Sequence, residues 1–321
     1  MEEKPLVSIV VSVYNHARYI EECLRGIAAQ TVDFPIEVLV ADDCSPDGTA
    51  DVLRALEPEL PNTFTLILRE QNLGAVKNGE DLYARATGKY LVDLEGDDFW
   101  TYEGKLQAQV EFLEGNPEYS AVYTRCTVVG ADSKPNGEEY PQCSHDEYTF
   151  KDYFYSCLPG QSGTLVCRRE QYVSMREEFM GMRTYEFYPG DRRNAFLFLV
   201  AGKVRCIQEN WSAYRHVTSG GSSYSSTVAL DDAYALNEVR FGETLVAYAQ
   251  LRGDEEAVKA AKKTYYRTYL KWACDGRSSL KLGACLRELM GERNRLSYLA
   301  SPVQWYAVLG TRMLMGKPVD L

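Results

Sequence analysis

Short apolar runs alternate with amphipathic stretches along the first hundred residues of the chain. The runs are rich in β-branched residues and short, which predicts buried strands. The stretches between them place apolar residues at helical spacing, which predicts helices with one buried face. The predicted strands cover residues 6–14, 36–41, 64–68 and 89–94, and the predicted helices cover residues 17–30, 48–56 and 75–86. Strands that alternate with helices form parallel βαβ units, so the predicted fold class is α/β, with a doubly wound, mostly parallel central sheet flanked by helices.

The pattern is mixed after residue 100 and helical after residue 230. The predicted elements are a helix at 105–114, a strand at 121–129, a polar loop at 131–148, an apolar helix at 195–201, a strand at 203–215 and a flexible Ser/Gly connection at 219–223. We therefore predict one domain over residues 1–225 and a helical C-terminal region over residues 226–321. The domain has two expected halves, residues 1–115 and residues 116–225.

Two of the predicted strands end in adjacent carboxylates. Asp42 and Asp43 follow the second strand, and Asp97 and Asp98 follow the fourth. Ligands of open α/β sheets bind beyond the carboxyl ends of the strands, so the two pairs predict one shared site. A hard divalent cation such as Mg²⁺ or Mn²⁺ binds carboxylate oxygens and shares its remaining positions with substrate phosphates. The sequence therefore predicts a site for a nucleotide-diphosphate substrate and a metal ion.

Polar residues also end the first predicted strand. Together with the first carboxylate pair they form a candidate nucleotide-binding site. The members of this candidate site are Ser12, Tyr14, Asn15, Asp42 and Asp43. A carboxylate accepts a hydrogen bond from a uracil ring N–H, and hydroxyl and amide groups reach base carbonyls and ribose. The alternative is that Asn15 and Asp47 cap helices and that the aspartate pair only opens a turn.

Three further segments carry candidate chemistry. Lys77 lies where a helix starts, a place that suits an anion or a base carbonyl, or else it is a solvated surface lysine. Asp191 precedes an apolar helix, where it is either a catalytic base or a helix cap, and Glu186 competes for the catalytic role. Arg215 and His216 precede the Ser/Gly connection and are candidates for a lid over a pyrophosphate.

Charge is distributed unevenly along the chain. The 321 residues carry a net charge of −11, while residues 257–321 alone carry 12 Lys/Arg and 4 Asp/Glu. Together with the apolar segment at 298–315, this basic excess predicts a helix that contacts an anionic membrane surface; a helical cap or a dimer interface is the alternative.

Nothing in the sequence predicts export or a zinc site. Nine cysteines without a C-x-x-C pair favour reduced thiols over disulfides. The acidic N-terminus does not resemble a signal peptide, and no apolar run has the ~18 residues of a membrane span. We therefore expect a cytoplasmic protein, at most peripheral on the inner face of the membrane.

Four spaced motifs in this chain resemble those of the inverting family-2 glycosyltransferases with the GT-A fold. They are SVYN at 12–15, DDCSPDGT at 42–49, NLG at 72–74 and GDD at 96–98. The resemblance covers residues 5–115 and continues more weakly from Asp191 to Ser223. It implies that residues 1–115 bind the nucleotide and that residues 116–225 bind the acceptor.

The resemblance also implies roles for individual residues. Asp43 would contact the nucleotide base with Ser12 beside it, and Lys77 would lie near the base. Asp97 would contact the ribose or the metal shell, and Asp98 would ligate Mg²⁺ or Mn²⁺.

By the same resemblance, Asp191 would be the catalytic base, although the chain has Gly-Asp-Arg where the family commonly has a Glu-Asp pair. The base would take a proton from an acceptor hydroxyl as its oxygen displaces the nucleotide diphosphate, which inverts the anomeric centre in one step. The expected donor is a UDP-sugar, with GDP and dTDP as alternatives, and the expected acceptor is a glycan or a lipid-linked glycan. The competing hypothesis is an inactive relative that only binds nucleotide sugars or serves as a scaffold.

Overall fold

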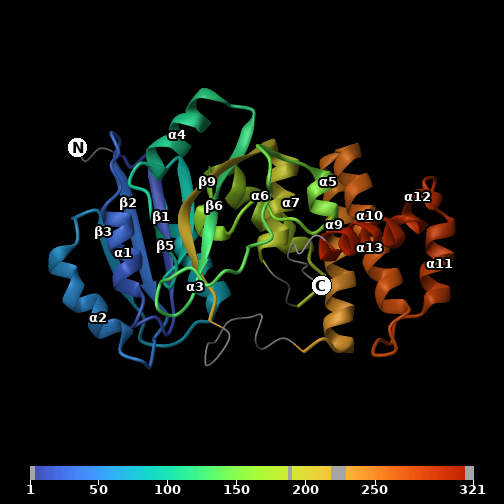
Figure 1. The fold of residues 1–321 in the computed structure, drawn as a ribbon, viewed down its shortest axis with the longest axis horizontal. Coiled ribbons are helices and arrows are strands. Elements are labelled where there is room, and N and C mark those ends of the chain that lie inside the picture. Colours follow the sequence, from blue (N-terminus) through green and yellow to red (C-terminus); the bar gives the residue numbers. More distant parts are fainter. Residues whose placement is uncertain (1–3, 187–189, 218–228, 315–321) are drawn as a thin grey trace. The chain divides into compact units, whose positions relative to one another are not determined.

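The computed structural model describes residues 4–186, 190–217 and 229–314, with side chains up to residue 307. These residues fall into two compact units (Figure 1). The first comprises residues 1–147, 159–173 and 202–216, and the second comprises residues 148–158, 174–201 and 217–321. The Ser/Gly connection predicted at 219–223 lies outside the described residues.

The first unit is built on one mixed sheet, in the order β3-β2-β1-β4-β8-β6-β9-β5, with β7 paired to β9. Its strands are β1 Val7–Val13, β2 Ile36–Asp42, β3 Phe64–Leu68, β4 Tyr90–Glu95, β5 Phe99–Trp100, β6 Tyr119–Val129, β7 Glu147–Tyr148, β8 Val166–Arg168 and β9 Lys203–Arg215. Its complete helices are α1 Ile20–Ala28, α2 Thr49–Leu56, α3 Ala75–Arg85 and α4 Lys105–Gly115. The last two residues of the predicted 131–148 loop form β7, which corrects that prediction.

The four strands predicted in the first hundred residues are parallel neighbours. β1 pairs with β2 on one side and with β4 on the other, and β3 pairs with β2. From β1 the chain adds β2 and then β3 on one side of the sheet, and it then crosses back to add β4 on the other side of β1. The direction in which strands are added therefore reverses between β1 and β4. Such a reversal leaves a crevice beyond the carboxyl ends of the two strands, where ligands of doubly wound folds bind. The predicted doubly wound α/β fold is confirmed.

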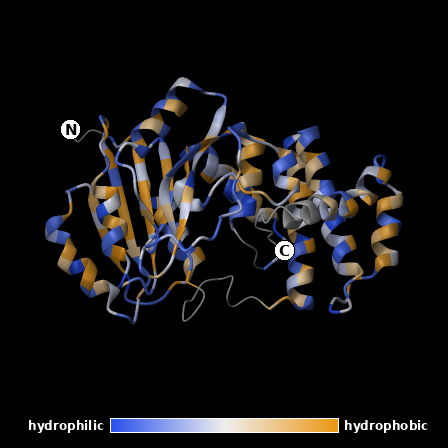
Figure 2. Ribbon diagram, viewed as in Figure 1, coloured by the Kyte–Doolittle hydropathy of each residue, from blue (hydrophilic) through white to orange (hydrophobic). Residues whose placement is uncertain are grey.

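Burial explains why the central strands are continuous apolar runs instead of alternating ones. Val7, Ile9 and Val11 of β1 are fully buried, and so are the residues between them. Strands with both faces covered read in this way because neither face meets water. Figure 2 shows the same apolar character along the central strands.

The second unit is helical, as predicted for the residues after 230, although turns interrupt it near residues 274–281 and 291–294. Its core gathers aromatic and aliphatic side chains, including Tyr266, Trp272 and Leu289. The helices are α5 Phe150–Phe154, α7 Gly190–Ala201, α9 Asp232–Arg252, α10 Glu255–Ala273, α11 Leu282–Met290, α12 Arg295–Leu299 and α13 Ser301–Leu314. Helix α6, Arg169–Met182, begins in the first unit's sequence and ends in the second's.

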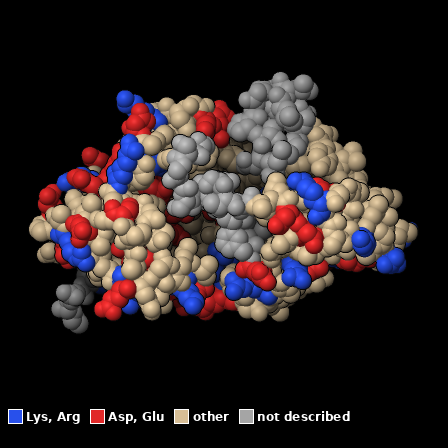
Figure 3. Space-filling model, turned by 90° about the horizontal axis from the view of Figure 1, so that it is seen from below, with Lys and Arg blue, Asp and Glu red and all other residues tan. Residues whose placement is uncertain are grey.

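Across the described helices, none combines the length and the apolar character that crossing a bilayer requires. On the face drawn in Figure 3, acidic and basic side chains are interspersed.

Lys105, at the start of α4, is a fully buried lysine in the core of the first unit. Its Nζ donates to Gln109 Oε1 at 2.8 Å and lies 4.3 Å from the centre of the Trp100 ring. Burial lowers the pKa of Lys105 from 10.5 to about 7. The Trp100 ring favours the charged amine and opposes this shift, but one ring does not replace the hydration of an ammonium group.

We expect this lysine to make stability depend on pH. Between about pH 7 and pH 10 the folded protein holds Lys105 neutral while the unfolded chain keeps it protonated, so folding releases a proton and stability rises with pH. The free energy of unfolding of the wild type, measured against Lys105→Met by urea titration, should rise by about 2 kcal/mol between pH 7 and pH 9. Equal pH dependence in the two proteins would show that Lys105 keeps its charge in the core.

Candidate active site

The carboxyl ends of β1, β2 and β4 lie level with one another in the sheet. Ser12 is opposite Ala41 of β2 on one side and Glu95 of β4 on the other. The backbone N–H of Gly96 donates to Ser12 O at 3.0 Å, and that of Asp43 donates to Val13 O at 2.9 Å. The loops that leave these strands therefore meet at the crevice between β1 and β4.

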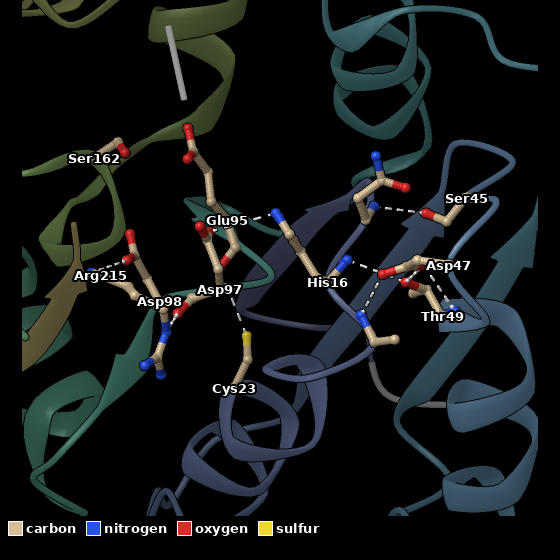
Figure 4. A network of polar contacts seen from close by, with 12 residues as sticks. His16, Cys23, Ser45, Asp47, Thr49, Glu95, Asp97, Asp98, Ser162 and Arg215 are labelled. Carbon is tan, nitrogen blue, oxygen red and sulfur yellow. Dashed lines mark hydrogen bonds and ion pairs between the residues drawn. The ribbon is translucent and has the colours of Figure 1, made fainter. Parts of the chain in front are cut away.

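The loop after β1 is fastened to the loop after β2 by side chains of the second loop. Asn15 N donates to Ser45 Oγ at 2.9 Å, and His16 N donates to Thr49 Oγ1 at 3.1 Å (Figure 4). Ala17 N donates to Asp47 Oδ2 at 3.0 Å, and the other oxygen of this carboxylate accepts from Thr49 N. Asp47 therefore fastens the two loops to each other, and it is not the N-cap of α2, which is Gly48.

Asn15 itself is not a helix cap in this structure. It has φ of +61°, a conformation that asparagine tolerates better than most residues. Its Oδ1 is buried and accepts no hydrogen bond. Asn15 therefore turns the chain after β1, and its side-chain oxygen Oδ1 has no hydrogen-bond donor.

Both carboxylates of the first aspartate pair are buried and hold neighbouring loops. Asp42 accepts from Ser45 Oγ at 2.5 Å and from Ser45 N at 3.3 Å. Asp43 accepts from Leu73 N at 2.7 Å and from Gly74 N at 2.9 Å. Asp43 thereby joins the loop after β2 to the turn that starts α3, so two of the sequence motifs meet here. The role of either aspartate in nucleotide binding stays a prediction.

Three carboxylates gather at the end of β4 and in the turn that follows it. One oxygen from each of Glu95, Asp97 and Asp98 lies within 4.8 Å of the others, which is close enough to hold a metal ion. The turn is closed by a hydrogen bond of 3.1 Å from Asp98 N to Glu95 O. Figure 4 shows Asp97 facing His16 and Asp98 next to Arg215. We call these three residues the acid cluster.

Asp98 is the buried member of the acid cluster, and the protein satisfies both of its oxygens. Oδ1 accepts from the backbone N–H of Arg215 at 2.7 Å, and Oδ2 accepts from Gln161 Nε2 at 2.7 Å. Burial raises the pKa of Asp98 well above its ordinary value, and the negative charges of Asp97 and Glu95 raise it further. The carboxylate is therefore costly to keep charged unless a cation accompanies it.

Asp97 differs from Asp98 because its side chain is 27% exposed and one oxygen remains available. Oδ1 is buried without a hydrogen bond, and His16 Nε2 lies 3.7 Å from it. A buried carboxylate oxygen without a donor, next to two more carboxylates, fits a divalent cation bound by oxygen ligands. The donor set of the acid cluster therefore suits the metal that the sequence predicts.

His16 reaches Asp97 because residue 96 is glycine. A Cβ at Gly96 would lie 2.9 Å from His16 Nδ1, a distance that non-bonded atoms do not tolerate. The imidazole therefore packs directly on the backbone of the acid turn. The position of His16 directly after Asn15 is the one sequence feature that points to it as a member of the site.

Arg215 lies at the end of β9 and is a buried part of the framework. Its side chain is 1% exposed, and it donates to Asp97 O, Gly130 O and Glu22 Oε2 at 2.9, 2.8 and 2.7 Å. The guanidinium also lies 4.2 Å from the centre of the Tyr19 ring. The residue proposed for a lid thus ties the acid turn to α1, and its role toward a pyrophosphate stays a prediction.

The remaining candidates lie at different places. His216 pairs with Glu138, its Nδ1 lying 2.5 Å from Oε2. Lys77 and Tyr14 are exposed to solvent. Asp191 belongs to the second unit, in the first turn of α7.

Comparisons with known proteins give the chain its family. The family model of "Glycosyl transferase family 2" matches residues 8–168. The uncharacterised protein Rv1520 of Mycobacterium tuberculosis is 33% identical over 215 residues, which cover 67% of this chain and 60% of the relative. The putative teichuronic acid biosynthesis glycosyltransferase TuaG of Bacillus subtilis is 30% identical over 171 residues, 52% of this chain and 64% of TuaG.

A solved structure extends the likeness to the fold. The structure of S. aureus TarS 1–349 in complex with UDP-GlcNAc matches with a TM-score of 0.59 at 16% identity and covers 98% of this chain and 93% of TarS 1–349. The chain belongs to glycosyl transferase family 2, and its fold is of the GT-A type. It spans about 60% of the length of its mycobacterial relatives.

We expect Arg215→Met to destabilise the protein by about 3 kcal/mol, because the carbonyl of Asp97 loses its donor and Glu22, which keeps the Ser133 hydroxyl, loses its cationic partner. His216→Gln, at the neighbouring position, should change the free energy of unfolding by less than about 0.5 kcal/mol, since a partly exposed ion pair contributes little. Urea titration of both variants measures the difference. A stable Arg215→Met protein with weakened nucleotide binding would instead support the lid role.

Proposed function

We propose that this chain transfers a sugar from a nucleotide-diphosphate donor, with UDP as the nucleotide, to a hydroxyl of a glycan or lipid-linked acceptor. The reaction is a single displacement that inverts the anomeric centre and uses Mg²⁺ or Mn²⁺. The observation that carries the proposal is the acid cluster, which lies beyond β4 where the strand order reverses. Three carboxylates in the crevice of a doubly wound sheet repel anions unless a metal joins them.

The contacts of the acid cluster favour Asp97, with Glu95 beside it, as the metal ligand. Both oxygens of Asp98 accept hydrogen bonds from the protein, whereas Asp97 Oδ1 accepts none. The sequence assigned the metal to Asp98 and the ribose or metal shell to Asp97. We propose a different division of these roles: Asp97 binds the metal directly, and Asp98 holds the turn in place.

A metal at this position would neutralise negative charge on the leaving diphosphate. The chain's own residues do the rest of the binding. We propose that the nucleotide lies along the loops after β1 and β2, with the base near Asp43 and the ribose near Ser12, and with Lys77 supplying a positive charge. The solved TarS complexes contain UDP and UDP-GlcNAc, which supports UDP as the nucleotide.

For the base we propose Asp191, which takes the proton from the acceptor hydroxyl as the new glycosidic bond forms. Its carboxylate lies in the first turn of α7, where the helix dipole favours the charged form that a base requires. Glu186 is the second candidate. Residues 116–225 are proposed to bind the acceptor, and residues 226–321 to form a helical accessory region.

Nucleotide binding is tested by thermal unfolding of the purified chain with UDP, GDP, dTDP or CMP, each with Mn²⁺ or with EDTA. A ligand that binds only the folded state raises the melting temperature. We expect UDP with Mn²⁺ to raise it, and UDP with EDTA to raise it less. A larger shift with GDP or dTDP would change the donor class, and no shift with any nucleotide would favour the inactive hypothesis.

The metal assignment is tested in the same assay with Asp97→Asn and Asp98→Asn. Asp97→Asn should abolish the Mn²⁺-dependent shift and leave the melting temperature without ligand close to that of the wild type, because Asp97 Oδ1 makes no hydrogen bond. Asp47→Asn is the matched control, since Asp47 also lies in a loop beyond a strand but makes only backbone and threonine contacts. Loss of the shift in Asp98→Asn but not in Asp97→Asn would restore the assignment made from the sequence.

The base is tested by turnover of the UDP-sugar that the binding assay supports. Asp191→Asn should lower kcat by about 10²-fold or more and leave donor affinity unchanged, because a missing base impairs the proton transfer and not nucleotide binding. Asp254→Asn, at the start of α10 in the same unit, is the control for loss of an aspartate near a helix terminus. An unchanged kcat in Asp191→Asn, with a loss in Glu186→Gln, would transfer the role to Glu186.

A further inference from the structure

Helices α12 and α13 expose an apolar face to solvent. Four side chains at spacings of three, four and three residues form this face, which we call the apolar stripe. They are Leu296, Leu299, Val303 and Tyr306, exposed to 76%, 46%, 72% and 49%. Surface helices of soluble proteins ordinarily present polar residues on this side, so a continuous apolar face marks a contact with another apolar surface.

The opposite face of the same helices holds them against α10. Tyr298 stacks on Tyr266 with ring centres 5.5 Å apart, and Arg267 lies 5.1 Å from the centre of the Trp305 ring. Tyr298 and Trp305 are both buried. Turning the stripe inward would expose these two aromatic residues, so the packing of the unit fixes the stripe on the outside.

The acidic residues that precede the stripe have partners within the unit. Glu292 accepts from Lys262 at 2.7 Å, and Glu288, which is itself exposed, accepts from Tyr265 at 3.1 Å. The basic residues face solvent and form no ion pair with any carboxylate of the described part of the chain. They are Arg287, Arg293 and Arg295. The exposed charges directly before the stripe in the sequence, Arg293 and Arg295, are therefore positive and have no carboxylate partner in the described part of the chain.

We infer that the apolar stripe docks on an anionic lipid surface. Leucine, valine and tyrosine side chains would enter the boundary between headgroups and acyl chains, while the arginines remain at the level of the phosphates. A second copy of the chain is the less suitable occupant. A two-fold dimer through this face would bring the same arginines close to their own copies, and like charges repel.

The contact depends on two terms that can be measured separately. The attraction of the arginines to anionic headgroups is screened by salt, with a Debye length of about 10 Å at 0.1 M. The burial of the stripe is not screened. Binding should therefore require anionic lipid, weaken as NaCl is added, and fail when either the stripe or the arginines are changed.

The experiment is sedimentation of the full chain with vesicles of phosphatidylcholine alone or with 30% phosphatidylglycerol. We expect binding to the anionic vesicles and little to the neutral ones. The double variant Leu296→Glu with Val303→Glu should weaken binding by about tenfold or more, and so should Arg293→Gln with Arg295→Gln. Leu251→Glu, at an exposed leucine of α9 in the same unit, is the matched control and should bind like the wild type.

Circular dichroism and thermal unfolding verify that the variants fold, as expected for side chains that face solvent. Should the glutamate pair not fold, the arginine pair alone decides the matter, because these side chains lie on the surface. Equal binding of all proteins, or no binding to anionic vesicles at low salt, would overturn the inference. So would a dimer, seen by light scattering, that the stripe variants dissociate while vesicle binding stays absent.

Discussion

The first unit of this protein is organised around the cost of keeping three carboxylates close together. Glu95, Asp97 and Asp98 share a space in which any two of them repel, and Asp98 is also removed from water. Hydrogen-bond donors from distant segments offset this cost. Gln161 and the backbone N–H of Arg215 donate to Asp98, and the Arg215 guanidinium donates to the carbonyl of Asp97. One oxygen of Asp97 still accepts no hydrogen bond, and this is where we propose that a cation binds.

The same constraint explains residues that are remote from the acid turn in sequence. Cys23 of α1 lies beneath the turn, with its thiol directed to Glu95 O, and burial together with the charges of Asp98 and Asp97 raises the pKa of this thiol. A neutral thiol is therefore the form that fits below the acid cluster. Glycine at residue 96 lets the His16 ring approach from the other side. Cys23 below the turn and Gly96 within it thus leave room for the three carboxylates and the imidazole to lie close together.

Much of the fold followed from the pattern of residues. The strands and helices of the first hundred residues were predicted within a few residues, because strands buried on both faces and helices with one apolar face have distinct periods. The motifs at residues 12–15, 42–49, 72–74 and 96–98 were each visible, and the hydrogen bonds from Leu73 and Gly74 to Asp43 show two of them in contact. The sequence did not reveal Gln161 as the donor to Asp98, since nothing local marks a glutamine 63 residues away.

The sequence by itself therefore determined the βαβ order, the family and the identity of the acidic residues, since these depend on local periodicity and on short motifs. Only the tertiary structure decided how each carboxylate is used. Adjacent aspartates look alike in a sequence, but Asp97 and Asp98 face different surroundings, and burial and hydrogen-bond donors distinguish them. The same is true of Arg215 and of the apolar stripe on α12 and α13. Whether an arginine is buried, or an apolar residue exposed, depends on which distant segments pack against it, and that is a property of the folded chain alone.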